Sequence, residues 1–204
     1  MDLKSSFKSD LNKEQKLSTL LDECYKNYLK NYTYKRIHDL KSQLMGIDII
    51  FTHKSSGNSF YIDEKAQLDY INDDLPTFAF ELQYEKGGFL KKGWLFDENK
   101  STNFYSLITG IYSDEPEKFT SCKITFVNRE KLIELLSNKG INNSSLSAYI
   151  ESNTAQNGKL IIDELNSKNE GYLFFSSSNK KEKPVNLILK LEFLLNENVG
   201  KRFC

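Results

Sequence analysis

The sequence predicts an α/β or α+β protein in which a central mixed sheet is flanked by helices. Apolar side chains recur at helical spacing over residues 17–32. After Gly46 the pattern changes to the two-residue alternation of strands, and the C-terminal half combines short helices with further strands. For 204 residues we expect one domain over 1–204, with its regular core over about 10–85 and a less regular part over 86–204.

The first predicted element is an amphipathic helix with one buried face. Its apolar positions are Leu17, Leu20, Leu21, Cys24, Tyr25, Tyr28, Leu29 and Tyr32. Extended toward the N-terminus, the same face passes through Glu14, whereas Glu23 falls on the opposite side. A shorter helix is predicted over 34–44, with Gly46 as its stop.

A β-hairpin is predicted next. Residues 46–53 indicate its first strand, 54–58 its turn and 59–66 its returning strand. The remaining strands are predicted at 77–84, 89–96, 103–112, 122–127, 172–176 and 185–191, and the remaining helices at 128–137 and 144–152.

Composition and charge exclude several classes of protein. The apolar fraction of 39% excludes a globally disordered chain. The 28 basic and 28 acidic residues balance, so any contact with nucleic acid needs a local basic patch. Three widely spaced cysteines without a CxxC pair predict neither a zinc site nor a disulfide framework. Without an apolar leader or a membrane-length apolar run, we expect a reduced, cytoplasmic protein with no membrane partner.

One group of acidic and basic residues coincides with the predicted hairpin. Asp48 lies in the first strand, and Asp63, Glu64 and Lys65 lie in the second. Because residues two apart share a face, Asp63 and Lys65 project together while Glu64 points away. A hairpin of this length brings Asp48 beside Asp63 and Lys65. Two carboxylates and one ammonium suit a cation such as Mg²⁺ or Mn²⁺, and such a site activates water against a phosphodiester.

The acid-x-Lys triplet alone does not select this position. The sequence contains five triplets: Asp2/Lys4, Glu14/Lys16, Asp39/Lys41, Asp63/Lys65 and Glu98/Lys100. Only Asp63/Lys65 lies well inside a predicted strand whose hairpin partner also carries an acid, so the context rather than the triplet makes it a candidate.

This arrangement resembles the core of the PD-(D/E)xK, or restriction-endonuclease-like, nuclease superfamily. The matching segments are 43–48 and 62–67, with the predicted helix before them and the strand at 77–84 after them. The resemblance implies that Asp48 and Asp63 bind Mg²⁺ and that Lys65 assists the attack of water on DNA. Glu64 remains an alternative to Asp63 as the second ligand.

Two further residues are candidates through the same resemblance. Some members of the superfamily place a glutamate of the first helix near the metal, and Glu14 has the helical phase for this position. Some members carry a glutamine shortly after the lysine, which makes Gln67 a candidate for lining the site. The sequence departs from the family pattern at Ile47, where a proline is usual.

Other interpretations stay open. Asp48 and Asp63 also fit ordinary strand-edge acids paired with lysines on a solvated face. A nuclease-like binding module without catalysis fits the neutral charge, because nucleases usually need a positive channel. Gln43 fits a capping role as well as a role in the site, Trp94 fits the core better than base stacking, and the lysines at 180, 181 and 183 fit a solvated loop. A homodimer is expected only by analogy with nucleases that cut both strands.

Overall fold

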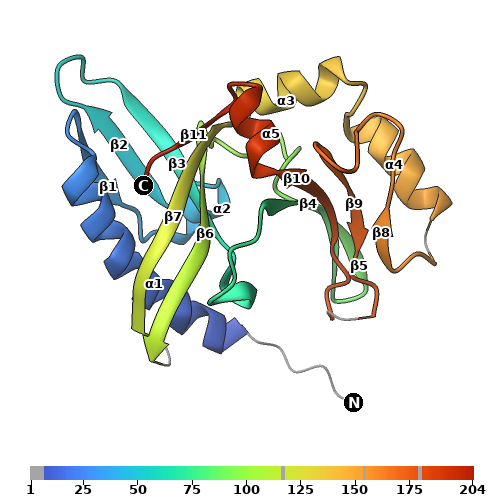
Figure 1. Ribbon diagram of the computed structural model, residues 1–204, viewed down its shortest axis with the longest axis horizontal. Coiled ribbons are helices and arrows are strands. Elements are labelled where there is room, and N and C mark those ends of the chain that lie inside the picture. Colours follow the sequence, from blue (N-terminus) through green and yellow to red (C-terminus); the bar gives the residue numbers. More distant parts are fainter. Residues whose placement is uncertain (1–6, 116–117, 154, 179–180) are drawn as a thin grey trace. The chain divides into compact units, whose positions relative to one another are not determined.

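A computed structural model of the chain describes residues 7–115, 118–153, 155–178 and 181–204 (Figure 1). Its backbone contacts form two compact units. The six-strand unit comprises the described residues of Ser6–Leu75, Asn99–Arg129 and Gly200–Cys204, and the five-strand unit comprises Pro76–Glu98 and the described residues of Glu130–Val199. Two sheets with a few helices agree with the predicted mixed α+β content.

The described helical segments are α1 (Phe7–Tyr28), α2 (Leu40–Leu44), the 3₁₀ turn η1 (Leu68–Tyr70), α3 (Arg129–Asn138), α4 (Asn143–Ser152) and α5 (Leu191–Asn196). The described strands are β1 (Tyr32–Arg36), β2 (Ile49–His53), β3 (Ser59–Ala66), β4 (Thr77–Lys86), β5 (Phe89–Lys92), β6 (Phe104–Glu115), β7 (Lys118–Asn128), β8 (Gly158–Leu160), β9 (Gly171–Phe175), β10 (Val185–Lys190) and β11 (Gly200–Arg202).

The sheet of the six-strand unit has the order β1-β2-β3-β6-β7-β11. Strands β3 and β6 run parallel, with Asp63 beside Tyr105, and the other neighbouring strands are antiparallel. A parallel neighbour needs a long connection, and the chain between β3 and β6 contains η1, β4 and β5.

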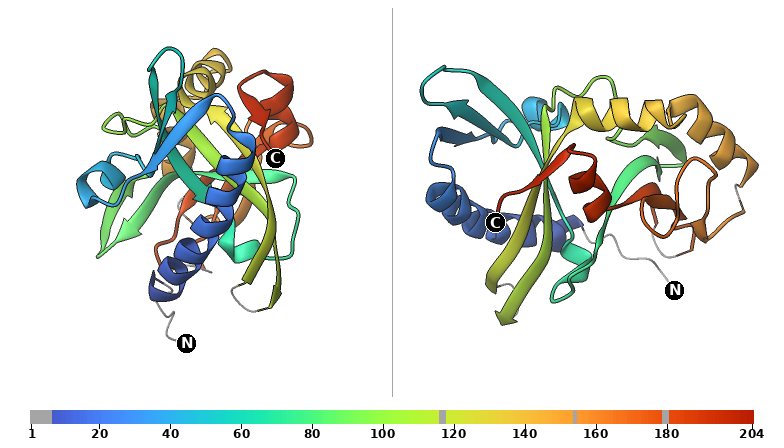
Figure 2. Two further views of the ribbon diagram at one scale, coloured as in Figure 1. Left: turned by 90° about the vertical axis from the view of Figure 1, so that its left-hand side faces the viewer. Right: turned by 45° about the horizontal axis from the view of Figure 1, so that its top comes forward.

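Helix α1 covers one face of this sheet, as Figure 1 and the left view of Figure 2 show. Leu17, Leu21 and Tyr25 are buried against a cluster that includes Ile49 and Ile62. These three residues belong to the predicted apolar stripe, so burial of that face holds α1 on the sheet. The predicted helix is confirmed, although it ends at Tyr28 and leaves Tyr32 to a strand.

The helix predicted over 34–44 is wrong in its first part. Residues Tyr32–Arg36 form the edge strand β1, which pairs with β2 so that Tyr34 lies beside Phe51. Within β1 the half-buried residues alternate with exposed ones, which is the two-residue period of a strand. Only Leu40–Leu44 is helical, with the Asp39 carboxylate accepting a hydrogen bond from the Ser42 N–H at 2.9 Å as its N-cap.

The strand predicted at 77–84 forms, but it belongs to the other sheet. Strand β4 lies between β5 and β10 in the five-strand order β5-β4-β10-β9-β8, and β6 occupies the position beside β3. The strand that follows the hairpin in sequence is therefore not its neighbour in the sheet.

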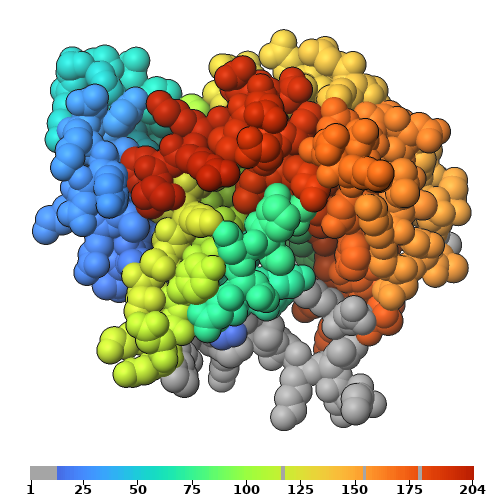
Figure 3. Space-filling view, in the orientation of Figure 1, coloured from blue at the N-terminus to red at the C-terminus, as the bar shows by residue number. Residues whose placement is uncertain are grey.

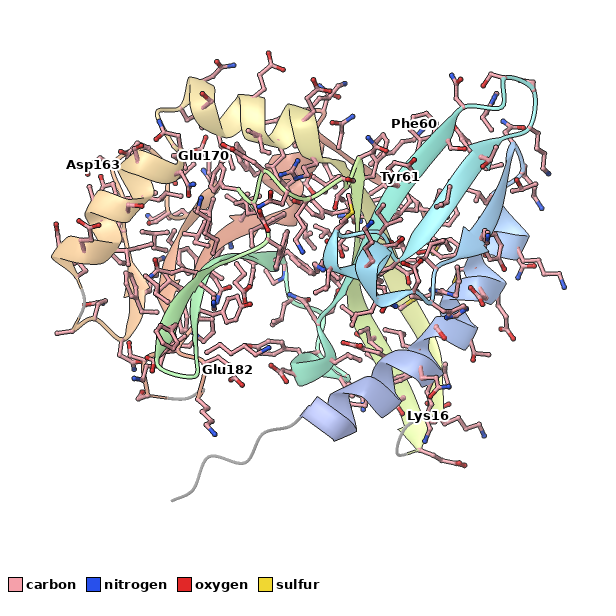
Figure 4. All side chains as sticks on the ribbon, turned by 180° about the vertical axis from the view of Figure 1, so that it is seen from behind. Lys16, Phe60, Tyr61, Asp163, Glu170 and Glu182 are labelled. Carbon is pink, nitrogen blue, oxygen red and sulfur yellow. The ribbon has the colours of Figure 1, made fainter. Side chains whose placement is uncertain are left out.

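The five-strand unit buries alternate residues of its central strand β10, namely Val185, Leu187 and Leu189. Trp94 is half-buried with its ring 5.3 Å from that of Phe80, which agrees with its predicted place in the core. In this unit the turn before β10, labelled at Glu182 in Figure 4, contacts β4, because the Glu182 carbonyl accepts the Glu85 N–H at 2.6 Å. Lys181 and Lys183 are exposed, and Lys180 lies outside the described residues.

In the part of the chain that the structure describes, no helix is both long enough and apolar enough to span a bilayer.

Candidate active site

The β2–β3 hairpin places Asp48 and Asp63 on facing positions. Asp48 directly precedes β2, its N–H donates to the Ile62 carbonyl at 2.9 Å, and its own carbonyl accepts the Ile37 N–H at 2.8 Å. Because Ile49 pairs with Ile62, Asp48 is the next cross-strand partner and faces Asp63. Facing partners of an antiparallel pair project from the same side of the sheet. The structure thus brings together two acids that are 15 residues apart in the sequence.

Lys65 completes this group from β3. Its ammonium donates to Asp63 Oδ1, and Asp63 itself is only 2% exposed. Asp48 Oδ2 accepts the Glu64 N–H at 2.8 Å, which fixes the Asp48 carboxyl against β3. Side chains along β3 alternate between the two faces of the sheet. Phe60, labelled in Figure 4, packs on the α1 side, and Tyr61, also labelled there, lies on the face of Asp63 and Lys65.

The electrostatics of this carboxylate pair favour a cation. Burial, followed by the negative charge of Asp63, raises the pKa of Asp48 to about 7, and the positive charge of Lys65 opposes this rise. Asp63 Oδ2 is buried, and it accepts no hydrogen bond from any donor among the described residues. With one ammonium for two carboxylates, the full ionisation of the pair leaves one negative charge uncompensated.

These donors fit a hard divalent cation. A Mg²⁺ site commonly uses one or two carboxylates and keeps several waters, so Asp48 and Asp63 are a sufficient set of protein side chains. Among the described residues no group of three or more His, Cys, Asp or Glu side chains is placed to hold a metal. A cation here would therefore rest on the carboxylate pair and on water.

Gly46 forms a close-packed turn that leads into Asp48. Its φ of +73° is in the left-handed region, and an added Cβ would lie 2.4 Å from Thr102 Oγ1 and 3.2 Å from Asp63 Oδ2. The Thr102 hydroxyl donates to the Gly46 carbonyl at 2.8 Å, and the Lys100 ammonium donates to the Leu44 carbonyl at 2.8 Å. The segment 100–102 therefore holds the turn in place beside Asp63.

Sequence reasoning missed Lys100 and Thr102 as neighbours of the site. Both bonds join residues 56 positions apart, and no local periodicity connects segments at that distance. Glu98/Lys100 is one of the five acid-x-Lys triplets, but it lies outside the strands, and its sequence does not predict the contact of Lys100 with Leu44.

Glu64 lies on the opposite face of β3 from Asp63. Its carboxylate accepts the Tyr25 hydroxyl at 2.7 Å and the Arg36 Nη1–H at 2.6 Å. The Arg36 Nε–H also donates to the Asp22 carboxylate at 2.6 Å. The Tyr25 hydroxyl oxygen lies 3.1 Å from that of Ser106. The Glu64 side chain is therefore held on the α1 side of the sheet, away from the face that carries Asp63.

Glu14 is also not brought to the carboxylate pair. It is exposed on α1, and α1 packs on the face of the sheet that carries Glu64.

Gln67 directly follows β3, where its N–H donates to the Ile108 carbonyl at 3.0 Å and its amide oxygen is buried. Gln43 is exposed and its amide donates to the Ile37 carbonyl at 3.3 Å, which is a local contact at the turn before Asp48.

Comparison with known proteins does not place the chain in a family. No protein-family model, no curated protein and no solved structure matches it.

Proposed function

We propose that the six-strand unit hydrolyses phosphodiester bonds in DNA with the help of Mg²⁺ or Mn²⁺. The observation that supports this proposal is the placement of Asp48 opposite Asp63, with Lys65 donating to the same carboxylate. The sequence resemblance to PD-(D/E)xK nucleases assigns these three residues the same roles.

Asp48 and Asp63 would hold the cation, which when bound supplies polarisation of a phosphate oxygen and a lowered pKa for water. Lys65 lies on the same face, where its ammonium can orient a water molecule and stabilise negative charge that develops on the phosphate. The Glu64 N–H keeps the Asp48 carboxyl turned toward Asp63. Since Asp48 has a pKa of about 7, protons compete with the cation below neutral pH, and activity is expected to fall in acid.

The proposal is tested by cleavage of plasmid and single-stranded DNA in the presence of Mg²⁺ or Mn²⁺. We expect Asp63→Asn and Lys65→Ala to abolish cleavage while the far-UV circular dichroism spectrum is unchanged. Glu14→Gln is a matched control, because it alters the acid of another acid-x-Lys triplet that lies on exposed helix surface. If Asp63→Asn and Lys65→Ala cleave DNA as fast as the wild type does, the assignment of Asp63 and Lys65 to the active site is wrong.

A binding module that keeps this scaffold without catalysis is the second candidate, and the balanced charge of the chain favours it. Millimolar Mn²⁺ separates the two functions. A cation held by Asp48 and Asp63 raises the unfolding temperature of the wild type by mass action, and it has no such effect on Asp63→Asn. An unchanged unfolding temperature together with absent cleavage supports the binding module. The cytoplasmic location and the homodimer stay predictions.

A further inference from the structure

The three cysteines of the chain meet in the six-strand unit. Cys24 lies on α1, Cys122 lies in β7, and Cys204 follows β11. Cys24 and Cys122 pack against the same apolar cluster as Phe203, the residue before Cys204, and the three thiols lie close enough to influence one another electrostatically. All three are free thiols in the structure, and the proposed nuclease chemistry uses none of them.

The fold holds Cys204 beside α1 through its neighbour Phe203. The Phe203 ring lies 6.0 Å from that of Tyr25 and 6.2 Å from that of Tyr28, both on α1. Two backbone hydrogen bonds tie this end of the chain to Ile124 of β7. The Phe203 N–H donates to the Ile124 carbonyl at 2.8 Å, and the Cys204 carbonyl accepts the Ile124 N–H at 3.0 Å. The mark of the C-terminus lies beside α1 in every view of Figures 1 and 2, and in Figure 3 the red end of the chain reaches the surface next to the blue segment.

The three thiols differ in access and in freedom to move. Cys204 is exposed, whereas Cys24 and Cys122 are half-buried. Cys122 lies within β7, where its neighbours Ser121 and Lys123 pair with Tyr112 and Thr109 of β6. Cys204 lies outside the strands, so its backbone can adjust to the narrow geometry of a disulfide more easily than that of Cys122.

The chemistry that this cluster supports is disulfide formation. Two thiols held close together by the fold have a high effective concentration for each other.

We propose that Cys24 and Cys204 form a reversible disulfide when the protein meets a low-molecular-weight disulfide such as glutathione disulfide. The exposed Cys204 thiolate attacks one sulfur of glutathione disulfide, which gives a mixed disulfide and releases one glutathione thiolate. The Cys24 thiolate then attacks the Cys204 sulfur and releases the second glutathione. Two protein thiols are thereby oxidised and one glutathione disulfide is reduced, and the protons lost by the two protein thiols pass through solvent to the two released glutathione thiolates.

The pH dependence of this reaction follows from the surroundings of Cys204. Burial and the neighbouring Cys24 raise the pKa of Cys204 to about 11. Only the thiolate attacks, so the rate of the first exchange is expected to rise about tenfold for each unit of pH between 7 and 9. This behaviour separates the cluster from a cysteine with a lowered pKa, whose rate would be flat over that range.

The experiment is a mass-spectrometric map of the full chain after incubation with millimolar glutathione disulfide at pH 8, followed by acid quenching and alkylation. We expect a peptide pair that joins Cys24 to Cys204, with Cys122 alkylated. The variant Cys122→Ser should keep this cross-link, and Cys204→Ser should lose it and retain a thermal unfolding curve close to that of the reduced wild type. Oxidation should raise the unfolding temperature of the wild type by roughly 5–15 °C.

A parallel incubation in 8 M urea is the control for native geometry. There the cross-link should fall to a minor product, because unfolding separates residues that are far apart in the sequence. A stable glutathione adduct on Cys204 without an internal bond would overturn the proposal, and so would a dominant link between Cys24 and Cys122. These readouts need no DNA and no divalent cation, so they stand or fall independently of the nuclease proposal.

Discussion

Gly46→Ala tests whether the turn before Asp48 is as closely packed as its surroundings indicate. Gly46 has a φ of +73°, and a Cβ at this position would lie 2.4 Å from the Thr102 hydroxyl, which is buried. The left-handed backbone costs a non-glycine residue about 1–2 kcal/mol. The clash adds about 1–3 kcal/mol, because either Thr102 or the turn must move. We therefore expect Gly46→Ala to lower the free energy of unfolding by about 2–5 kcal/mol.

Gly57→Ala is the matched control. Gly57 lies in the turn of the same hairpin with nearly the same φ, +74°, but an added Cβ would meet nothing within 4 Å. It should therefore cost only the backbone contribution of about 1–2 kcal/mol. Urea denaturation followed by circular dichroism gives both values, and the difference between them isolates the clash at Gly46.

A double variant makes the test sharper. Thr102→Ala removes the atom nearest to the added Cβ, so in that background Gly46→Ala should cost less than in the wild type. It should still cost somewhat more than Gly57→Ala, because Asp63 Oδ2 at 3.2 Å and Lys100 Cδ at 3.3 Å stay close to the added Cβ. The packing of Gly46 against Thr102 would be refuted if Gly46→Ala lowered the free energy of unfolding equally in the wild type and in Thr102→Ala. It would also be refuted if Gly46→Ala and Gly57→Ala had equal effects in the wild type.

Two further predictions concern the charges on either face of β3. Because the pKa of Asp48 is raised from 3.8 to about 7, the folded state binds more protons than the unfolded state between these values, and the stability of the metal-free protein falls as pH rises through that window. Asp48→Asn should therefore raise the free energy of unfolding by roughly 2–4 kcal/mol at pH 8 and change it little at pH 4, and an equal effect at both pH values would contradict the raised pKa. On the other face, Arg36→Met leaves the Glu64 carboxylate, 13% exposed, with the Tyr25 hydroxyl but no positive partner, and should cost about 3–5 kcal/mol in urea denaturation. Arg36→Met combined with Glu64→Gln should recover part of this loss; a double variant as unstable as the single one would show that the Arg36–Glu64 pair is not its cause.

The elements with strong local periodicity could be predicted from the sequence. The three- and four-residue spacing from Leu17 to Tyr25 identifies the buried face of α1, and the alternation on either side of Gly57 identifies the β2–β3 hairpin. The juxtaposition of Asp48 and Asp63 follows from that hairpin alone, because cross-strand partners are determined by the turn between them.

Features that depend on distant segments were not predictable in this way. The interaction that holds Glu64 away from Asp63 requires Arg36, which lies in an edge strand whose short alternating pattern resembled a helix. The strand beside β3 is β6, although β4 comes first in the sequence, because sheet order is decided by packing between segments far apart in the chain. The meeting of Cys24 with Cys204 likewise has no sequence signal, since residues at these spacings are brought together only by the docking of β11 and the residues after it.

Whether Asp48 and Asp63 bind a divalent cation can be seen in a crystal structure of the full chain soaked in Mn²⁺ at pH 8, with anomalous data to locate the ion. We predict one anomalous peak bound by carboxylate oxygens of both Asp48 and Asp63, at the roughly 2.0–2.3 Å usual for such ions, with water completing the coordination. The same soak of Asp63→Asn should show no peak at this position. A wild-type crystal without a peak between the two carboxylates, or with a peak only at surface carboxylates elsewhere, would contradict the account.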